Sequence, residues 1–293
     1  MRDYLKLLNV KNLLLIALVQ IVVKFGLFEP FGVAITLNKY GFLLLLIATL
    51  SIAAGGNALL FQSSSYKTPV FSEHLSNRLF ILLNVIGVGL GFYLANIVGK
   101  PGFAAIFIIA SGVLYSYSIY LRTIAIANLL VVGFLSMLPI LIIGIFDLIP
   151  VLNSTNQALQ RVMFSILFDY AIFGFFIVVI RQMIVGCTTM DLDHRAGVAT
   201  VSILLGRDRT LKIVGVLTLF PIAGIIYYLY TYLFSNTLAV FLILLTLIAP
   251  LLYVMIKAWL IESKKGLEQL VWILTYILLM TILSLFVYQF IIL

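Results

Sequence analysis

Nine apolar runs, separated by short polar links, follow one another along the chain. A spanning helix needs about 20 mostly apolar residues. None of the runs alternates apolar and polar residues over about ten positions, as a transmembrane β-strand does. Since lipid offers backbone groups no hydrogen bonds, unbroken runs of this length predict helices. We therefore predict an all-α, polytopic transmembrane bundle of about nine helices that forms a single integral membrane domain over residues 1–293. The runs cover approximately residues 8–27, 41–61, 79–98, 102–121, 124–146, 161–181, 212–234, 237–257 and 269–292.

The composition also indicates a lipid environment. Hydrophobic residues make up 64% of the 293 residues and charged residues only 10%, whereas a soluble domain carries about 25% charged residues. So few charges could not cover a water-facing surface for a chain of this length. Cys187 is the one cysteine in the sequence, which excludes an intrachain disulfide bond.

The distribution of basic residues predicts the orientation in the membrane. A formal net charge of +8 could indicate a nucleic-acid partner in a soluble protein. In a membrane protein, Lys and Arg in short links mark the cytoplasmic side instead, so we expect no nucleic-acid partner. With a cytoplasmic N-terminus, fourteen of the 18 Lys and Arg residues lie inside: Arg2, Lys6, Lys11, Lys67, Arg78, Arg122, Arg181, Arg195, Arg207, Arg209, Lys212, Lys257, Lys264 and Lys265. The other four are Lys24, Lys39, Lys100 and Arg161, and Lys24 is expected to extend to the outer interface.

Two long cytoplasmic loops are expected at about residues 62–78 and 182–211, and motif residues gather in and beside them. The motif residues are Asn57, then Tyr115, Ser116, Arg122 and Asn128, then Arg181, Asp193, Ala196, Gly197, Thr200, Leu205, Gly206 and Arg207. Their types and spacing resemble the motifs of the UbiA prenyltransferase superfamily. The helix count and the cytoplasmic placement agree with that resemblance, and the similarity extends to bacterial sequences labelled geranylgeranylglycerol-phosphate geranylgeranyltransferase.

The resemblance implies a UbiA-like fold in a bacterial inner membrane. It also implies transfer of an isoprenyl chain, geranylgeranyl in the branch with that label, from its diphosphate to a lipid or aromatic acceptor. Such proteins use Mg²⁺, because a hard cation held by carboxylates and phosphates neutralises the diphosphate as it leaves. Aspartates three or four positions apart share a helix face, and two such faces could hold the metal ions and the diphosphate.

The carboxylates of this pattern are mostly replaced. The family's three first-motif aspartates fall on Ala58, Phe61 and Ser65, and those of the second motif on Gly186, Thr189 and Asp193. Five of the six are therefore absent, and only Asp193 is retained. This loss leaves catalytic activity open. A non-catalytic protein that binds lipid or isoprenoid, a pseudoenzyme, is the alternative.

The resemblance assigns roles to the polar residues that remain. Asn57, Lys67, Arg122 and Arg181 are the predicted diphosphate-binding residues, since arginine pairs well with phosphate oxygens. Tyr115 is predicted to line the isoprenyl pocket, and Asp193 is the candidate metal ligand. No residue is assigned as catalytic. Membrane lipids are expected partners in any case.

Asp169 lies in the middle of the sixth predicted helix. An acidic group at that depth costs a few kcal/mol in lipid unless it faces the bundle interior. One interpretation is a buried, hydrogen-bonded or protonated carboxyl. The other is an ion or proton site, which makes a small transporter the third functional hypothesis.

Overall fold

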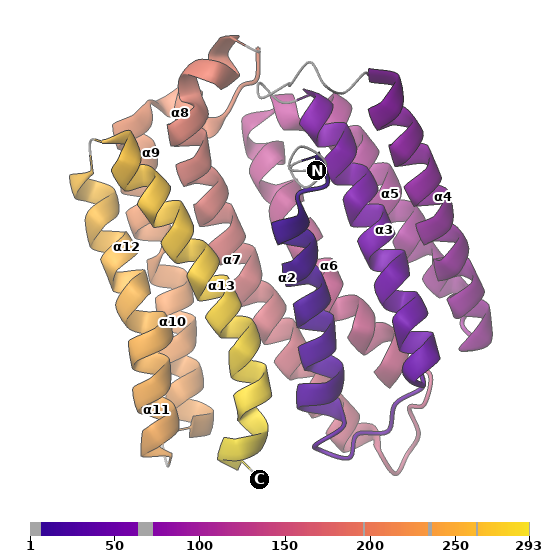
Figure 1. Cartoon of the computed structure of the whole chain (residues 1–293). Coiled ribbons are helices and arrows are strands. Elements are labelled where there is room, and N and C mark those ends of the chain that lie inside the picture. The colour runs from indigo at the N-terminus through magenta and orange to yellow at the C-terminus, as the bar shows by residue number, and fades with distance from the viewer. Residues whose placement is uncertain (1–6, 64–72, 196, 234–235, 262, 293) are drawn as a thin grey trace. The chain divides into compact units, whose positions relative to one another are not determined.

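A computed structural model describes residues 7–63, 73–195, 197–233, 236–261 and 263–292 (Figure 1). In this part of the chain nine helical spans are long and apolar enough to cross a membrane, which confirms the predicted helical bundle. The helices are α2 Val10–Ile21 with a π-helical continuation Val22–Phe28, α3 Lys39–Ser63, α4 Glu73–Ile97, α5 Ala104–Ile119, α6 Ala125–Leu148, α7 Gln157–Arg195, α8 Val201–Leu205, α9 Arg207–Leu217, α10 Leu219–Tyr228, α11 Thr237–Ile243, α12 Ala249–Leu260 and α13 Lys264–Ile292.

The predicted loop at 182–211 is wrong for most of its length. Helix α7 continues unbroken to Arg195 and is followed by α8 and the start of α9, so among the described residues of this stretch only 197–200 and Gly206 are not helical. The loop predicted at 62–78 is also shortened, because α3 reaches Ser63 and α4 begins at Glu73. Polar residues continue these helices because the ends lie outside the apolar core, where water can solvate their side chains.

The chain divides into two compact units. Unit 1 comprises residues 1–122 and 138–168, and unit 2 comprises residues 123–137 and 169–293. Helices α6 and α7 each contribute to both units. The single domain over residues 1–293 stays a prediction.

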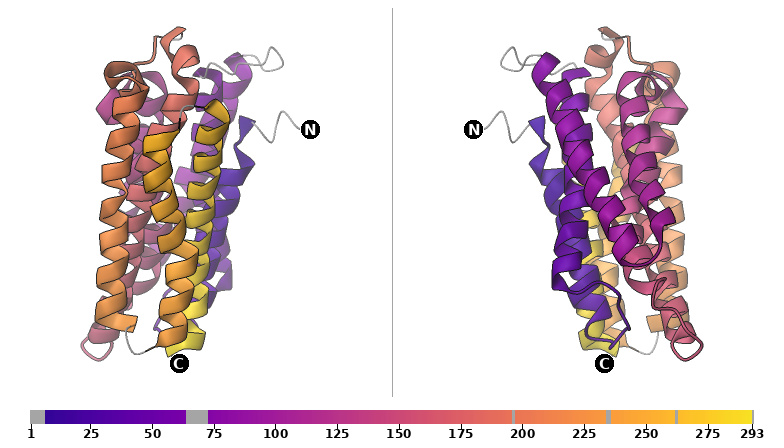
Figure 2. Two further views of the ribbon diagram at one scale, coloured as in Figure 1. Left: turned by 90° about the vertical axis from the view of Figure 1, so that its left-hand side faces the viewer. Right: turned by 90° about the vertical axis from the view of Figure 1, so that its right-hand side faces the viewer.

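In unit 1, glycines let α3 and α4 approach closely. A Cβ atom added at Gly87 of α4 would lie 2.5 Å from Ile52 Cγ1 and 2.9 Å from the backbone oxygen of Ala48, both on α3. Small residues at such crossings allow close backbone packing, which drives helix association in lipid. Helices α3 and α4 are drawn in purple in the right-hand view of Figure 2.

We expect Gly87→Ala to destabilise unit 1 by about 1–3 kcal/mol, because the backbone oxygen of Ala48 cannot move aside without shifting a helix. The matched control is Gly89→Ala on the same helix, where an added Cβ would meet nothing within 4 Å. That change should be neutral or slightly stabilising, since alanine is the better helix former. Thermal unfolding of the two detergent-solubilised variants measures the difference, and equal melting temperatures would contradict this account.

Lys24 does not extend to the interface as predicted. Its side chain is only 1% exposed, and its ammonium lies 2.8 Å from Asp147 Oδ2 and 2.6 Å from the carbonyl oxygen of Leu37. Asp147 is 0% exposed and also accepts the backbone N–H of Leu37 at 2.8 Å. The ion pair therefore ties the π-helical continuation of α2, the link before α3 and the end of α6 together within unit 1.

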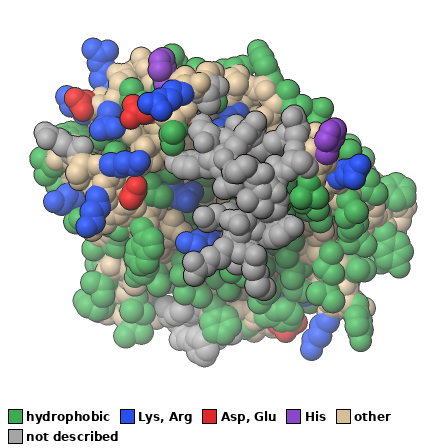
Figure 3. Space-filling view, turned by 45° about the horizontal axis from the view of Figure 1, so that its top comes forward, with side chains coloured by type: hydrophobic (Ala, Val, Ile, Leu, Met, Phe, Trp, Pro, Cys, Tyr) green, Lys and Arg blue, Asp and Glu red, His purple; other side chains and the backbone are tan. Residues whose placement is uncertain are grey.

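In unit 2, a continuous apolar core joins α7, α9, α10, α12 and α13. Its fully buried members include Ile180, Val214, Leu251, Leu270 and Ile277. The left-hand view in Figure 2 shows the helices α9 to α13 running along a common direction. The end of this unit that carries α8 and the starts of α9 and α13 is where its Lys and Arg residues gather (Figure 3).

Candidate functional site

The second motif lies on a helix that extends beyond a bilayer core. Helix α7 has 39 residues, which at 1.5 Å per residue gives a length of about 58 Å, against a hydrocarbon thickness of about 30 Å. Its last turns therefore project outside the core. Thr189 and Asp193 share one face there, and the Thr189 hydroxyl donates a 2.6 Å hydrogen bond to Asp193 Oδ2. The retained carboxylate thus already has a partner on its own helix.

Gly197 determines where α7 ends. Its φ of +70° is a left-handed conformation that glycine adopts without steric cost. The N–H of Val198 donates to the carbonyl of Asp193 at 2.9 Å, and the N–H of Gly197 donates to that of His194 at 3.1 Å. These two bonds form a Schellman motif, which satisfies the last carbonyls of the helix. The chain then turns back, and the Thr200 side chain caps the short helix α8 by accepting from the N–H of Ile203.

The turn brings α8 against α7 at the first aspartate position of the motif. Ser202 Oγ lies 3.3 Å from Cys187 Sγ and donates to the carbonyl of Met183 at 3.4 Å. A Cβ atom added at Gly186 would lie 2.9 Å from Ser202 Oγ. Both Gly186 and Ser202 are buried. Position 186 is therefore filled by α8, and a carboxylate there would have no room without a shift of Ser202.

Two arginines of unit 2 occupy this end. Arg181 Nε donates to Thr275 Oγ1 of α13 at 3.1 Å, and the structure shows no hydrogen bond from its two terminal nitrogens to any described residue. The Thr275 contact therefore orients the guanidinium group of Arg181. Arg207 begins α9, and its buried Nε likewise has no partner among the described residues.

The candidate residues of unit 1 are engaged in packing. Asn57 Nδ2 donates to the carbonyl of Leu8 at 2.9 Å, which ties α3 to the segment before α2. Ala58, at the first aspartate position of the first motif, is 0% exposed. Gly56 beside it lies so close to Leu114 of α5 that a Cβ atom there would meet Leu114 Cδ2 at 2.8 Å. The first-motif segment thus faces neighbouring helices at positions 56 and 58.

Tyr115 lies in the last turns of α5, and Arg122 lies just after this helix. Tyr115 is 49% exposed, and its ring lies 5.7 Å from the ring of Phe80 on α4. Arg122 is partly buried in the short turn Leu121–Thr123. Lys67 and Ser65 lie outside the described residues. The roles of Asn57, Lys67, Arg122 and Arg181 in diphosphate binding, and of Tyr115 in the isoprenyl pocket, stay predictions.

Asp169 is neither buried nor hydrogen-bonded to a described residue, so a protonated carboxyl is what remains of the first interpretation. Its side chain is exposed and makes no hydrogen bond to any described residue, whereas the neighbouring Tyr170 hydroxyl lies 2.9 Å from Ser284 Oγ. Ser165, one turn earlier on α7, is exposed on the same face. The structure therefore leaves the carboxylate of Asp169 accessible within a membrane-spanning helix.

The donor set does not fit a carboxylate-held magnesium centre. Among the described residues no three His, Cys, Asp or Glu side chains gather where they could share a metal ion. Position 58 is buried, position 186 is filled by α8, and the Thr189 hydroxyl already binds Asp193. Mg²⁺ usually takes one or two carboxylates together with substrate phosphates. Asp193 as a metal ligand therefore stays a prediction, and no step proposed for this chain depends on a metal.

The fold defines the class: an integral membrane protein with a UbiA-like polytopic helical bundle. The chain is similar to a solved structure of a digeranylgeranylglyceryl phosphate synthase, with a TM-score of 0.65 over 97% of this chain and 98% of that chain. The two sequences are 16% identical, so the similarity concerns the fold. No protein-family model matches the chain, and no curated protein matches its sequence. The resemblance inferred from the motifs is confirmed in the fold.

Sequence reasoning missed several residues that shape this end of the molecule. Ser202 fills the space beside Gly186, and Thr275 orients Arg181 from a helix more than 90 residues away. A single serine or threonine inside an apolar stretch belongs to no recognisable motif, so the sequence offered no reason to select either residue. The signal for Asp147 was present, since an acid at the end of an apolar run needs a partner, but the sequence does not indicate that the partner is Lys24.

Proposed function

We propose that the protein binds an isoprenyl diphosphate, geranylgeranyl diphosphate in the branch that its motifs resemble, and transfers the isoprenyl chain to a lipid or aromatic acceptor. The observation that carries this proposal is the fold shared with a digeranylgeranylglyceryl phosphate synthase over 97% of this chain. A bacterial inner membrane, with the N-terminus in the cytoplasm, is part of the same proposal. The positively charged end of unit 2 would then face the cytoplasm, where a soluble diphosphate head group arrives.

Prenyl transfer requires the bond between the isoprenyl carbon and the diphosphate oxygen to break. The diphosphate leaves with the electron pair, and the allylic cation is attacked by the acceptor, which then loses a proton. Charge grows on the leaving oxygens, so fixed donors directed at them lower the barrier. Arg181 supplies such donors, because Thr275 binds its Nε and leaves the two terminal nitrogens for phosphate oxygens.

The structure also favours a second candidate, a non-catalytic isoprenoid-binding protein. Position 58 is buried and position 186 is filled by Ser202, so the carboxylates are replaced by residues that pack. Such a site could retain an anion through arginine without promoting its departure. The two candidates share binding of the diphosphate and differ only in turnover.

Purified protein with radiolabelled geranylgeranyl diphosphate separates these cases. We expect the unmodified protein to bind, and Arg181→Ala to weaken binding by about tenfold or more, since a charge-assisted hydrogen bond contributes about 1.5–3 kcal/mol. Arg181→Lys should bind at an intermediate level, because it keeps the charge but loses the planar fork. The matched control is Arg161→Ala, which removes an exposed arginine from the opposite end of α7.

Product formation with an alkyl-glycerol phosphate acceptor, with or without Mg²⁺, would support the transferase. Binding without product under both conditions would support the second candidate. Absence of binding by the unmodified protein would contradict both, and equal losses in the Arg161 and Arg181 variants would show that Arg181 has no particular role.

A further inference from the structure

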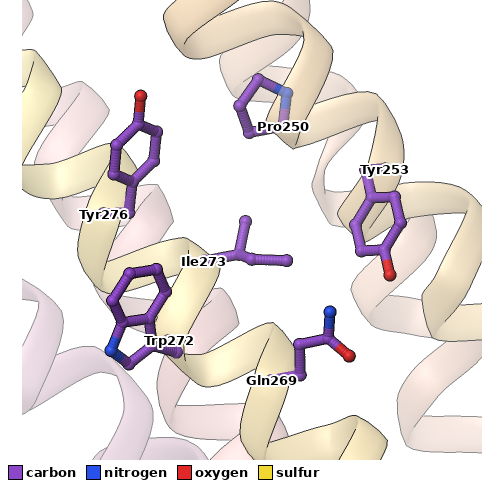
Figure 4. Close-up of a pocket in the computed structure, with 6 residues that line it drawn as sticks. All are labelled: Pro250, Tyr253, Gln269, Trp272, Ile273 and Tyr276. Atoms are coloured by element: carbon purple, nitrogen blue, oxygen red, sulfur yellow. The ribbon is translucent and has the colours of Figure 1, made fainter.

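An open groove of about 390 Å³ lies on unit 2 between α12 and α13. Its lining residues are Pro250 and Tyr253 of α12 and Gln269, Trp272, Ile273 and Tyr276 of α13 (Figure 4). Trp272 is 72% exposed. The groove belongs to unit 2 alone and is open along two membrane-spanning helices.

The groove is amphipathic along its length. Figure 4 shows the Tyr253 hydroxyl and the Gln269 amide directed toward the same end, with Ile273 lying deeper between the two helices. Neither the Gln269 amide nor the Tyr253 hydroxyl has a hydrogen bond to any described residue. The Lys257 ammonium lies 6.0 Å from the centroid of the Tyr253 ring, and Lys257 belongs to the last turn of α12. One end therefore offers two polar side chains and a cation, and the other offers mostly apolar and aromatic surface together with the Tyr276 hydroxyl.

The position of this polar end along the helices matches a membrane interface. Lys257 lies in the last turn of α12, and the exposed Lys264 and Lys265 begin α13. Gln269 follows them by about one turn, so the groove descends from the basic end of unit 2 into the apolar span. Trp and Tyr side chains favour this depth, where a ring can bury its body and keep its polar atom wet.

We propose that this groove is a binding site for one anionic phospholipid of the cytoplasmic leaflet. The lipid phosphate would lie at Lys257 and Gln269, and an acyl chain would follow Trp272, Ile273 and Pro250. Basic pockets between helices at the cytoplasmic side are known to bind anionic head groups. The site uses no residue of the proposed prenyl-transfer chemistry and stands without it, although the leaflet follows from the predicted orientation.

The charged side chains around the groove give a small excess of positive charge, which favours an anion. Glu268 is exposed on α13 beside Gln269 and is the acidic side chain nearest to the polar end among the described residues of these two helices. Lys257, Lys264 and Lys265 outnumber it. A single lipid phosphate fits this modest excess better than a highly charged head group, and a zwitterionic lipid would gain less because its own cation offsets the lysines.

Native mass spectrometry of the delipidated full-length protein tests the site with two probes of equal acyl chains, dioleoylphosphatidylglycerol and dioleoylphosphatidylcholine. We expect one molecule of the glycerol lipid to bind preferentially. Lys257→Gln should reduce that preference about fivefold, the effect of removing one lysine near an anionic head group. Trp272→Ala should weaken binding of both lipids, because the acyl chain loses the apolar surface of the indole ring.

Two controls match these changes. Lys212→Gln removes an exposed lysine from α9 at the same end of unit 2 without touching the groove, and Tyr227→Ala removes an exposed aromatic ring from α10. Neither should alter lipid binding. Equal affinity of the unmodified protein for the two lipids would overturn the proposal. A second outcome would also overturn it. If the mass spectra show dimers of the unmodified protein, and Trp272→Ala abolishes these dimers but still binds lipid, the groove is an interface between two copies of the chain.

Discussion

Replacing Asp147 by alanine is expected to lower the stability of unit 1 by about 3–5 kcal/mol, the usual cost of removing one partner of a buried ion pair. Lys24 would remain as an uncompensated ammonium that is 1% exposed, and the Leu37 N–H would lose its acceptor. A loss of this size is a large share of the stability of most proteins. The variant should therefore accumulate poorly in membranes, and its melting temperature in detergent should fall well below that of the unmodified protein.

The double variant Lys24→Met with Asp147→Asn separates charge from packing. It removes both charges, fills the space of the lysine stem and keeps an oxygen that can accept the Leu37 N–H. Buried ion pairs replaced by uncharged residues of similar size are often no less stable, so most of the lost stability should return. Glu29→Ala changes an exposed acid in the same region and should have little effect. A single Asp147→Ala variant as stable as the unmodified protein would disprove this role for the pair.

Restoring aspartates to the second motif should have opposite outcomes at its two empty positions. At Gly186 a new side chain would meet Ser202 Oγ at 2.9 Å and place an unpaired carboxylate in a buried position. Burying a charge without a partner costs several kcal/mol in practice. We expect Gly186→Asp to be the less stable variant by at least about 3 kcal/mol, with Gly186→Ala between it and the unmodified protein. Thermal unfolding of the three proteins in one detergent measures this order.

At Thr189 the same change should be tolerated and should create a cation site. The position is half-buried, and its side chain lies 2.6 Å from Asp193 Oδ2. Two carboxylates one turn apart repel each other, and Mg²⁺ would relieve that repulsion. Because a ligand that binds only the folded state stabilises it, Thr189→Asp should show a melting temperature that rises with Mg²⁺ concentration. The double variant Thr189→Asp with Asp193→Asn should lose that rise.

These two positions also bear on the proposed function. If Thr189→Asp gains both magnesium binding and prenyl transfer from a protein that only binds the diphosphate, the scaffold is competent and the replaced carboxylate limits it. If Gly186→Asp proves stable and also binds Mg²⁺, then α8 does not close the position as the structure indicates. Either result can be compared directly with the binding measured for Arg181→Ala.

The sequence by itself determined the membrane bundle. Apolar runs of about 20 residues can satisfy their backbone only as helices in lipid, so the nine spans followed from local composition. Each expected run has a counterpart among the described helices, with most ends displaced by several residues and the end of α7 displaced by 14, where polar side chains continue the helix outside the core. The motif residues, among them Arg181, Gly197 and Gly206, likewise resembled those of the UbiA superfamily, and the fold agrees with that resemblance.

Only the tertiary structure decided which polar groups bind one another and which positions are filled by packing. Lys24 reads as an interfacial lysine from its place near the end of a span, yet Asp147, 123 residues away, binds it inside unit 1. Gly186 reads as a lost ligand, yet Ser202 fills the space that a side chain would need. Hydrophobic periodicity reports whether a residue belongs in lipid or in water. It carries no information about which distant helix supplies the partner, because that choice depends on how the apolar faces pack and on the short range of hydrogen bonds and ion pairs.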